Sequence, residues 1–149
     1  MPTDSPMLPS ALFRLTLLTA GIACHGIAIM TTSAQFDYEQ PPIAYSTTAA
    51  HDRIAQLAAS IETGKLSLQW DQKQGWLPDL LKQLQVSPES QTLVFSKTSL
   101  QIRHITPSNP RAIYFSDDTY LGYVPGGDLI ELSAVDPQLG PVFYTLEQT

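Results

Sequence analysis

Cysteine is almost missing from this chain of 149 residues, in which Cys24 is the only one. A lone thiol cannot form an intramolecular disulfide, and it cannot supply the two thiols that covalent haem attachment requires. Basic residues are also scarce: eight Lys and Arg stand against fourteen Asp and Glu, which gives a net charge of −6. Because these few cations are scattered, the composition argues against binding to nucleic acid or to an anionic membrane surface.

Charged residues of all kinds make up only 15% of the chain, and its eight glycines are outnumbered by twelve prolines. This balance indicates many short elements joined by firm turns. The apolar fraction of 43% is ordinary for a globular protein, and the length suits one domain with a single core.

One long apolar run lies near the N-terminus. Residues 15–30 are almost wholly apolar or small, they follow the basic Arg14, and small residues precede a cleavage point after Ala34. This layout predicts a signal peptide over residues 1–34 and a periplasmic or secreted protein of 149 − 34 = 115 residues. The alternative is an uncleaved membrane anchor, although a spanning helix needs about 20 strongly apolar residues.

Two short helices are predicted after the signal segment. Apolar residues at helical spacing predict the first over 51–63, with Asp52 in its first turn and Gly64 ending it. The second opens with Trp76 to Asp79, where a proline suits the first turn, and ends before Pro88. The apolar positions are Ile54, Leu57, Ala58 and Ile61 in the first helix and Leu77, Leu80, Leu81 and Leu84 in the second.

Consecutive antiparallel strands are predicted in residues 111–148, where β-branched and aromatic runs alternate with turn residues. Further strands are expected at 66–70, at 92–95 as a buried strand, and more weakly at 100–105. The turns separating the C-terminal runs are Asp117-Asp118, Pro125 to Asp128, and Asp136 to Pro141.

These elements predict an α+β fold, with two short helices packed on one face of an antiparallel sheet of about five strands. The single domain spans residues 51–149. Residues 35–50, which contain the pair Pro41-Pro42, are expected to form an extended leader along its surface.

A serine–lysine nucleophile is one candidate chemistry, because Ser96-Lys97-Thr98-Ser99 places hydroxyls beside a lysine that could activate them. Only one fragment of the motif used by penicillin-recognising enzymes is present, and its order is wrong. We therefore interpret the string as the polar end of a strand.

Carboxylates gather between Asp117 and Asp136, and such clusters can serve acid–base chemistry or hold calcium. Aspartate at hairpin turns is explained by its local backbone hydrogen bonds, and no calcium-loop spacing is present. We interpret four of them as turn residues and Glu131 as a solvated strand position. The cluster comprises Asp117, Asp118, Asp128, Glu131 and Asp136.

The mature chain's two histidines, His51 and His104, have no cysteine to join them at a zinc site, so both are expected on the surface. Arg103, His104 and Arg111 could form a small cationic spot, but solvated loop charges are the preferred interpretation.

Aromatic side chains could line a carbohydrate or peptide groove, although a domain of this size needs most of them for its core. A cleft around Trp70, Trp76 and Tyr120 would favour a small ligand-binding domain. The aromatic residues considered are Trp70, Trp76, Tyr120, Tyr123 and Tyr144.

Three strings resemble a family of exported bacterial proteins of uncharacterised function: FSKTS from Phe95, PRAIYF from Pro110, and DPQLG from Asp136 with VFYTL close behind. The resemblance covers essentially the whole mature chain. Full-length members look like c-type cytochromes, because after a stretch like VFYTLEQ they continue into a Cys-x-x-Cys-His haem-attachment site.

This chain departs from that family because it holds no Cys-x-x-Cys-His, so none of the family's haem residues can be carried over onto it. The sequence also contains no recognisable catalytic constellation, so no catalytic, cofactor-binding or metal-binding residue is assigned. The resemblance implies an exported, non-catalytic module, either the N-terminal part or a truncated form of a periplasmic cytochrome c-like, electron-transfer protein. Haem c would then belong only to a longer protein. The expected partner is a periplasmic protein or the missing C-terminal haem domain. A free-standing ligand- or protein-binding domain is the alternative, ahead of a Ser/Lys or carboxylate hydrolase.

Overall fold

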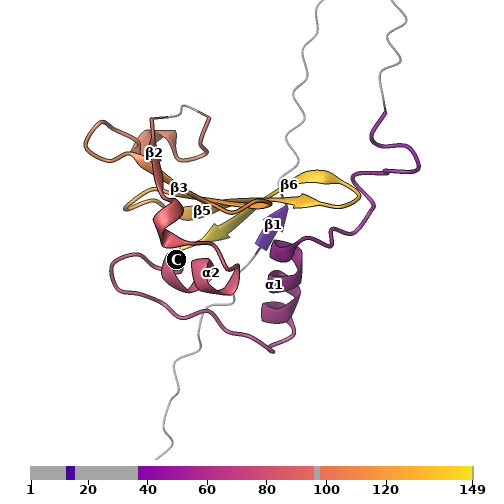
Figure 1. Cartoon of the computed structure of the whole chain (residues 1–149), viewed down its shortest axis with the longest axis horizontal. Helices are drawn as coiled ribbons and strands as arrows, with labels where there is room; N and C mark the ends of the chain where they lie inside the picture. The colour runs from indigo at the N-terminus through magenta and orange to yellow at the C-terminus, as the bar shows by residue number, and fades with distance from the viewer. Residues whose placement is uncertain (1–12, 16–36, 96–97, 149) are drawn as a thin grey trace, which may run out of the picture.

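Two helices lie on one face of an antiparallel sheet in this protein (Figure 1). The computed structural model describes residues 13–15, 37–95 and 98–148. The predicted α+β class, with two short helices packed on an antiparallel sheet, is confirmed.

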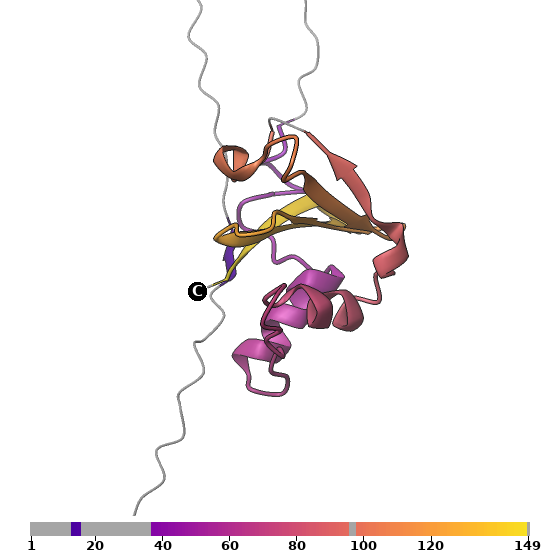
Figure 2. The same cartoon turned by 90° about the vertical axis from the view of Figure 1, so that its left-hand side faces the viewer.

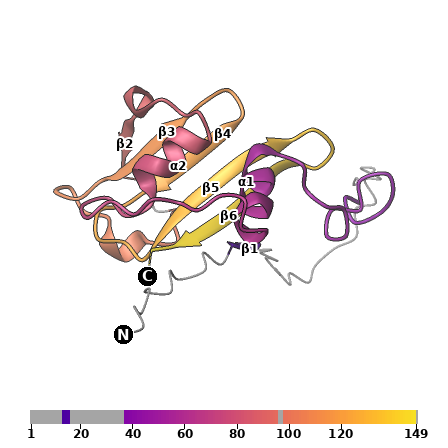
Figure 3. The same cartoon turned by 90° about the horizontal axis from the view of Figure 1, so that it is seen from below.

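The sheet is a meander in which strands β2 to β6 each pair with the next one along the chain. A further strand, β1, pairs with the outer side of β6, so β1 and β2 form the two edges (Figure 3). The strands are Phe13–Leu15 (β1), Thr92–Val94 (β2), Arg111–Phe115 (β3), Thr119–Tyr123 (β4), Leu129–Asp136 (β5) and Gly140–Glu147 (β6). The strands predicted in residues 111–148 are therefore confirmed.

Side chains alternate between the two faces of the sheet, as the strand pleat requires. Ile130 and Leu132 of β5, like Tyr144 and Leu146 of β6, are buried on the face that carries the helices. Both helices lie on this one side of the sheet (Figure 2). We call the opposite side the open face.

The helices are α1 (Arg53–Glu62) and α2 (Leu77–Gln83), and each turns an apolar stripe towards the sheet. The Asp52 carboxylate accepts hydrogen bonds from two backbone N–H groups of the first turn of α1, so this residue is the N-cap and not part of the first turn. Gly64 follows the end of α1 with a φ of +68°, as its predicted role requires.

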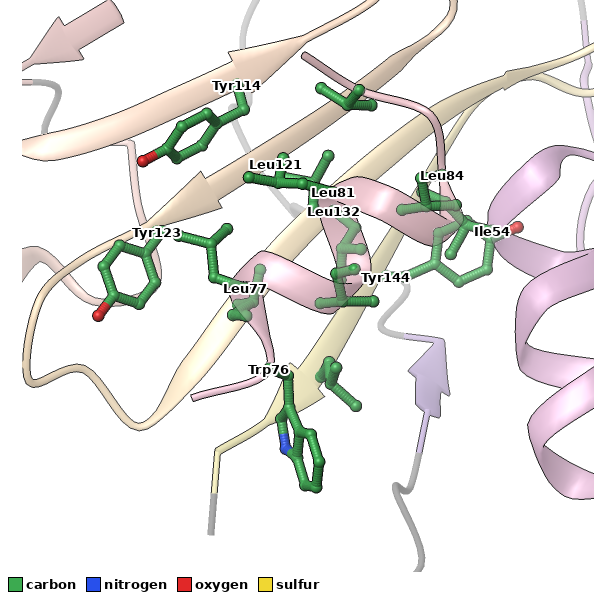
Figure 4. Packing of buried hydrophobic residues seen from close by; sticks show 14 of the residues in the cluster. Ile54, Trp76, Leu77, Leu81, Leu84, Tyr114, Leu121, Tyr123, Leu132 and Tyr144 are labelled. Carbon is green, nitrogen blue, oxygen red and sulfur yellow. The ribbon is translucent and has the colours of Figure 1, made fainter. Parts of the chain in front are cut away.

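Leucines of α2 fill the centre of the core (Figure 4). Leu77, Leu80 and Leu84 are at most 2% exposed, and burying each such side chain stabilises the fold by about 1.5–3 kcal/mol. Leu121 of β4 and Leu132 of β5 belong to the same buried cluster, so α2 is held against the middle of the meander.

Residues 66–70, predicted as a strand, pair with no strand among the described residues, although Leu68 is buried there. The Gln69 N–H donates to a carboxylate oxygen of Asp79 in α2 at 2.9 Å, so this backbone is bound to a helix side chain. The leader also differs from expectation, because consecutive turns replace extended chain in residues 37–50.

The run at residues 92–95 forms β2, but this strand is an edge and not buried: Leu93 and Phe95 are 55% and 61% exposed. Residues 100–105 contain a 3-10 helix at Ile102–His104 in place of a strand. A short apolar run indicates β propensity, but it does not reveal the position that the segment takes relative to the sheet.

Apart from Phe13–Leu15, the predicted signal peptide over residues 1–34 lies outside the described residues. Among the residues that the structure describes, none belongs to a helix long and apolar enough to cross a membrane.

Replacing Tyr144 with phenylalanine is expected to lower the free energy of unfolding by about 1.5–2 kcal/mol. Its hydroxyl donates to the Asp52 carboxylate at 2.5 Å and thereby joins β6 to the cap of α1. Burial, and then the hydrogen bond to Asp52, raise the pKa of Tyr144, so the hydroxyl keeps its proton. Urea unfolding measures the loss. Tyr120→Phe, on the open face, is the control and should change stability by less than about 0.5 kcal/mol.

Candidate functional site

The open face is divided between a buried polar cluster and an exposed row of aromatic side chains. The chain after Thr98 passes over this face, on the side of the sheet away from the helices (Figure 2). The polar cluster lies between that segment and the sheet, and the aromatic row lies on the exposed part of the same face.

An ion pair of 3.0 Å between Arg111 of β3 and Glu131 of β5 forms the centre of the polar cluster. The two side chains are only 15% and 13% exposed. Gly122 of β4 stands opposite Glu131 in the sheet, and a Cβ added there would meet the guanidinium at 2.3 Å. Glycine at this position therefore allows Arg111 to lie directly on the strand between the two charges.

Glu131 also holds the segment that covers it. Its carboxylate accepts from the Ser99 hydroxyl and from the Leu100 N–H, both at 2.8 Å. Gln101 is 5% exposed, and its N–H donates to the Ser99 hydroxyl oxygen at 3.0 Å. The buried Arg111 Nε and Gln101 Nε2 have no acceptor among the described residues, so the cluster keeps donor capacity that these residues do not use.

Two sequence predictions are wrong at this cluster. Glu131 is not a solvated strand position, and Arg111 is not a solvated loop charge. Both residues do point to the face opposite the helices, as their strand positions require. Both are largely shielded from solvent because the segment containing Ser99 covers that part of the open face.

The aromatic row consists of Phe115 of β3, Tyr120 of β4 and Phe143 of β6. The Phe115 and Tyr120 rings stack with centroids 6.4 Å apart and planes 20° apart. Tyr120 pairs with Ser133 of β5, which pairs in turn with Phe143, so the row crosses four neighbouring strands. The three aromatic residues are 43%, 42% and 61% exposed, which is unusual for side chains of this size on one sheet face.

The predicted serine–lysine site is only partly described, because Ser96 and Lys97 lie outside the described residues. Ser99 is 7% exposed and belongs to the polar cluster. Its hydroxyl donates to Glu131, whose carboxylate is already paired with Arg111.

The carboxylates of residues 117–136 do not converge on one site. Asp118 accepts from the hydroxyls of Ser116 and Thr119, as predicted for a hairpin-turn residue. The Thr119 hydrogen bond is the main reason that the pKa of Asp118 is lowered. Asp128 has a side chain that is 82% exposed. Asp136 is 2% exposed and accepts N–H groups of its own turn, so its predicted turn role is confirmed.

Both histidines of the described chain are exposed, as predicted. His104 lies 3.7 Å from the carboxylate of Asp128, and the backbone N–H of His51 donates to Asp136 at 2.6 Å. Within residues 13–15, 37–95 and 98–148, the structure brings no group of three His, Cys, Asp or Glu residues close enough to hold a metal ion.

The aromatic cleft considered for a small ligand is not formed by its three residues. Trp76 is buried in the core, where its ring meets that of Trp70 edge to face at 4.8 Å. Tyr120 lies on the open face, on the other side of the sheet. Tyr123 and Tyr144 are buried, as expected for core aromatics.

Sequence reasoning missed the aromatic row and the polar cluster, although signals for both are present. Phe115 and Tyr120 flank a tight hairpin at equal distance, which predicts that they pair across it. Gly122 within a run of strand-forming residues signals the close approach of another group.

Comparison of this chain with protein-family models, curated proteins and solved structures found no match.

Proposed function

We propose that this chain is an exported, non-catalytic module that binds a haem-c-bearing protein or domain through its aromatic row. The observation that carries the proposal is the exposure of Phe115, Tyr120 and Phe143 in one row across the open face, with Ser133 between the last two. Aromatic side chains on a rigid scaffold offer large contact area at low entropic cost, and they dominate the energy of many interfaces. The assignment of haem to the partner rests on the resemblance of the strings FSKTS, PRAIYF and DPQLG to a family of exported proteins.

A binding role is also supported by the chemistry of the polar cluster. The Ser99 hydroxyl is engaged by Glu131, and the charge of Glu131 is balanced by Arg111. A carboxylate held in this way is a poor general base. The cluster instead anchors the covering segment beside the aromatic row. The net charge of −6 favours a partner whose docking surface is basic.

An NMR titration of the isotope-labelled chain with a basic monohaem cytochrome c tests this function. The resonances of the aromatic row should shift first, and the affinity should fall as salt concentration rises. Phe143→Ser should weaken binding roughly tenfold, or about 1.4 kcal/mol. Leu93→Ser, which alters an equally apolar exposed residue on β2, is the matched control and should leave binding unchanged.

Resonance shifts confined to the helical side of the sheet would contradict the proposal, as would equal weakening by the two serine variants. Reading the DNA that follows the Thr149 codon then distinguishes the two forms of partner. An in-frame Cys-x-x-Cys-His would place the haem on the same polypeptide, whereas a stop codon would mean that the module stands alone and that any haem-bearing partner is a separate protein.

A further inference from the structure

Strand β6 lies between β5 and β1, and its backbone N–H and C=O groups point alternately towards these two neighbours. Directly after β6, the Gln148 N–H donates to the Asp128 carbonyl, on the β5 side, at 2.8 Å. Hydrogen-bonding directions alternate along an antiparallel strand. The backbone groups of Phe143, Thr145 and Glu147 therefore point away from β5, towards the outer edge of β6.

Two side chains limit this outer edge at its ends. The Tyr45 hydroxyl donates to the Pro141 carbonyl at 3.0 Å, and proline has no N–H to offer an incoming strand. At the other end, the Trp76 indole N–H donates to the Glu147 carbonyl at 3.2 Å. The edge can consequently accept only a short strand, centred between these two contacts.

In the described structure β1 occupies this position. Phe13 stands opposite Leu146, Arg14 opposite Thr145, and Leu15 opposite Tyr144. Leu146 and Tyr144 are buried beneath the helices, so the two outer positions of an incoming strand adjoin the apolar face.

The middle position of an incoming strand adjoins the open face. In β1 a basic residue, Arg14, takes this position, opposite Thr145. The acidic balance of the chain favours the same choice.

We propose that the outer edge of β6 is an acceptor for an extended segment of apolar–basic–apolar sequence from a partner protein, and that Phe13–Leu15 is a built-in competitor for it. Binding adds one antiparallel strand to the sheet, with backbone hydrogen bonds supplying affinity and the two apolar positions supplying specificity. The competitor lies within the predicted signal peptide, so removal of residues 1–34 would vacate the acceptor. In the intact chain β1 covers an edge that would otherwise associate non-specifically.

Weakening β1 in the full-length chain tests the proposal without substituting any residue of strands β2 to β6. Arg14→Pro removes the N–H opposite Thr145 and disfavours strand pairing. The probe is a labelled synthetic peptide of residues 11–17, ALFRLTL. The Arg14→Pro chain should bind this peptide at least about tenfold more tightly than the unaltered chain. The reason is that β1 occupies the outer edge of β6 in a smaller fraction of the molecules. Its Thr145 amide should exchange with solvent at least about tenfold faster when no peptide is present.

A second substitution, made in the Arg14→Pro chain, locates the peptide. Thr145→Pro removes an outward N–H from β6 and should abolish binding, whereas Thr145→Ala keeps this N–H and should preserve it. Equal peptide affinity and equal Thr145 exchange in the unaltered and Arg14→Pro chains would overturn the proposal. Peptide binding that survives Thr145→Pro would overturn it as well. If the Arg14→Pro chain formed a concentration-dependent dimer that the peptide did not disrupt, the occupant of the edge would be β6 of a second copy, and the proposed partner segment would be wrong.

Discussion

Replacing Asp136 with asparagine is expected to lower the free energy of unfolding by about 2–3 kcal/mol. One carboxylate oxygen accepts from the N–H groups of Gln138 and Leu139, both at 2.8 Å, which shapes the β5–β6 turn. The other accepts from the His51 N–H at 2.6 Å, which fixes the chain just before α1. Asparagine can replace the first oxygen, but its amide N–H₂ would face the His51 N–H with no acceptor between them.

The effect of Asp136→Asn should also depend on pH. Burial alone would raise the pKa of Asp136, but the N–H groups of His51, Leu139 and Gln138 outweigh burial and lower this pKa below 3.8. A carboxylate with a lowered folded-state pKa stabilises the fold above its unfolded-state pKa, and this contribution is lost as pH falls through the folded-state value. The stability difference between the variant and the unaltered chain should therefore be full near about pH 7 and shrink as the pH falls below 3.8.

Urea unfolding of both chains across this pH range is the measurement. Asp128→Asn serves as the matched control, because the Asp128 side chain is 82% exposed and its only ion pair is with the exposed His104 at 3.7 Å, among the described residues. The control should change stability by less than about 0.5 kcal/mol. An Asp136→Asn variant as stable as this control at neutral pH would show that the buried hydrogen bonds contribute nothing net.

The C-terminal sheet could be predicted because each of its strands carries its own signal. In β5, Ile130, Leu132 and Ala134 alternate with more polar residues, and turn residues bound each run, so pattern and propensity agree. The stripe of leucines from Leu77 to Leu84 likewise identifies α2 and its buried side. Local periodicity is sufficient wherever an element buries one face against a single core.

The polar cluster and the edge strands could not be predicted in the same way, because they depend on contacts between distant parts of the chain. Glu131 lies on the open side of a strand, where the pattern alone indicates solvent, yet Ser99 covers it from 32 positions away. Leu93 and Phe95 have the composition of a buried strand, but β2 is the last strand on its side of the sheet. Strand order and crossing segments decide burial in both cases, and neither is encoded in a window of a few residues.

Replacing Arg111 with alanine is expected to have the largest effect of any single change on the open face, a loss of about 3–5 kcal/mol. The variant leaves the Glu131 carboxylate nearly buried and without its cationic partner. Removing one member of a buried ion pair lowers stability more than removing one member of an exposed pair. The remaining charge is then shielded from water and has no partner. Arg53→Ala is the matched control: this arginine pairs with Asp118 at 3.5 Å, but both side chains are about half exposed, so its loss should cost less than about 1 kcal/mol.

A double-mutant cycle of Arg111→Ala and Glu131→Ala separates the pair from its surroundings. The sum of the stability losses of the two single variants should exceed the stability loss of the double variant by at least about 1.5 kcal/mol. The reason is that the second substitution removes the charge that the first one leaves without a partner. Urea unfolding gives all four stabilities. Additive losses would mean that the buried charges do not interact, and the cluster would then act only through the hydrogen bonds by which Glu131 holds Ser99 and Leu100.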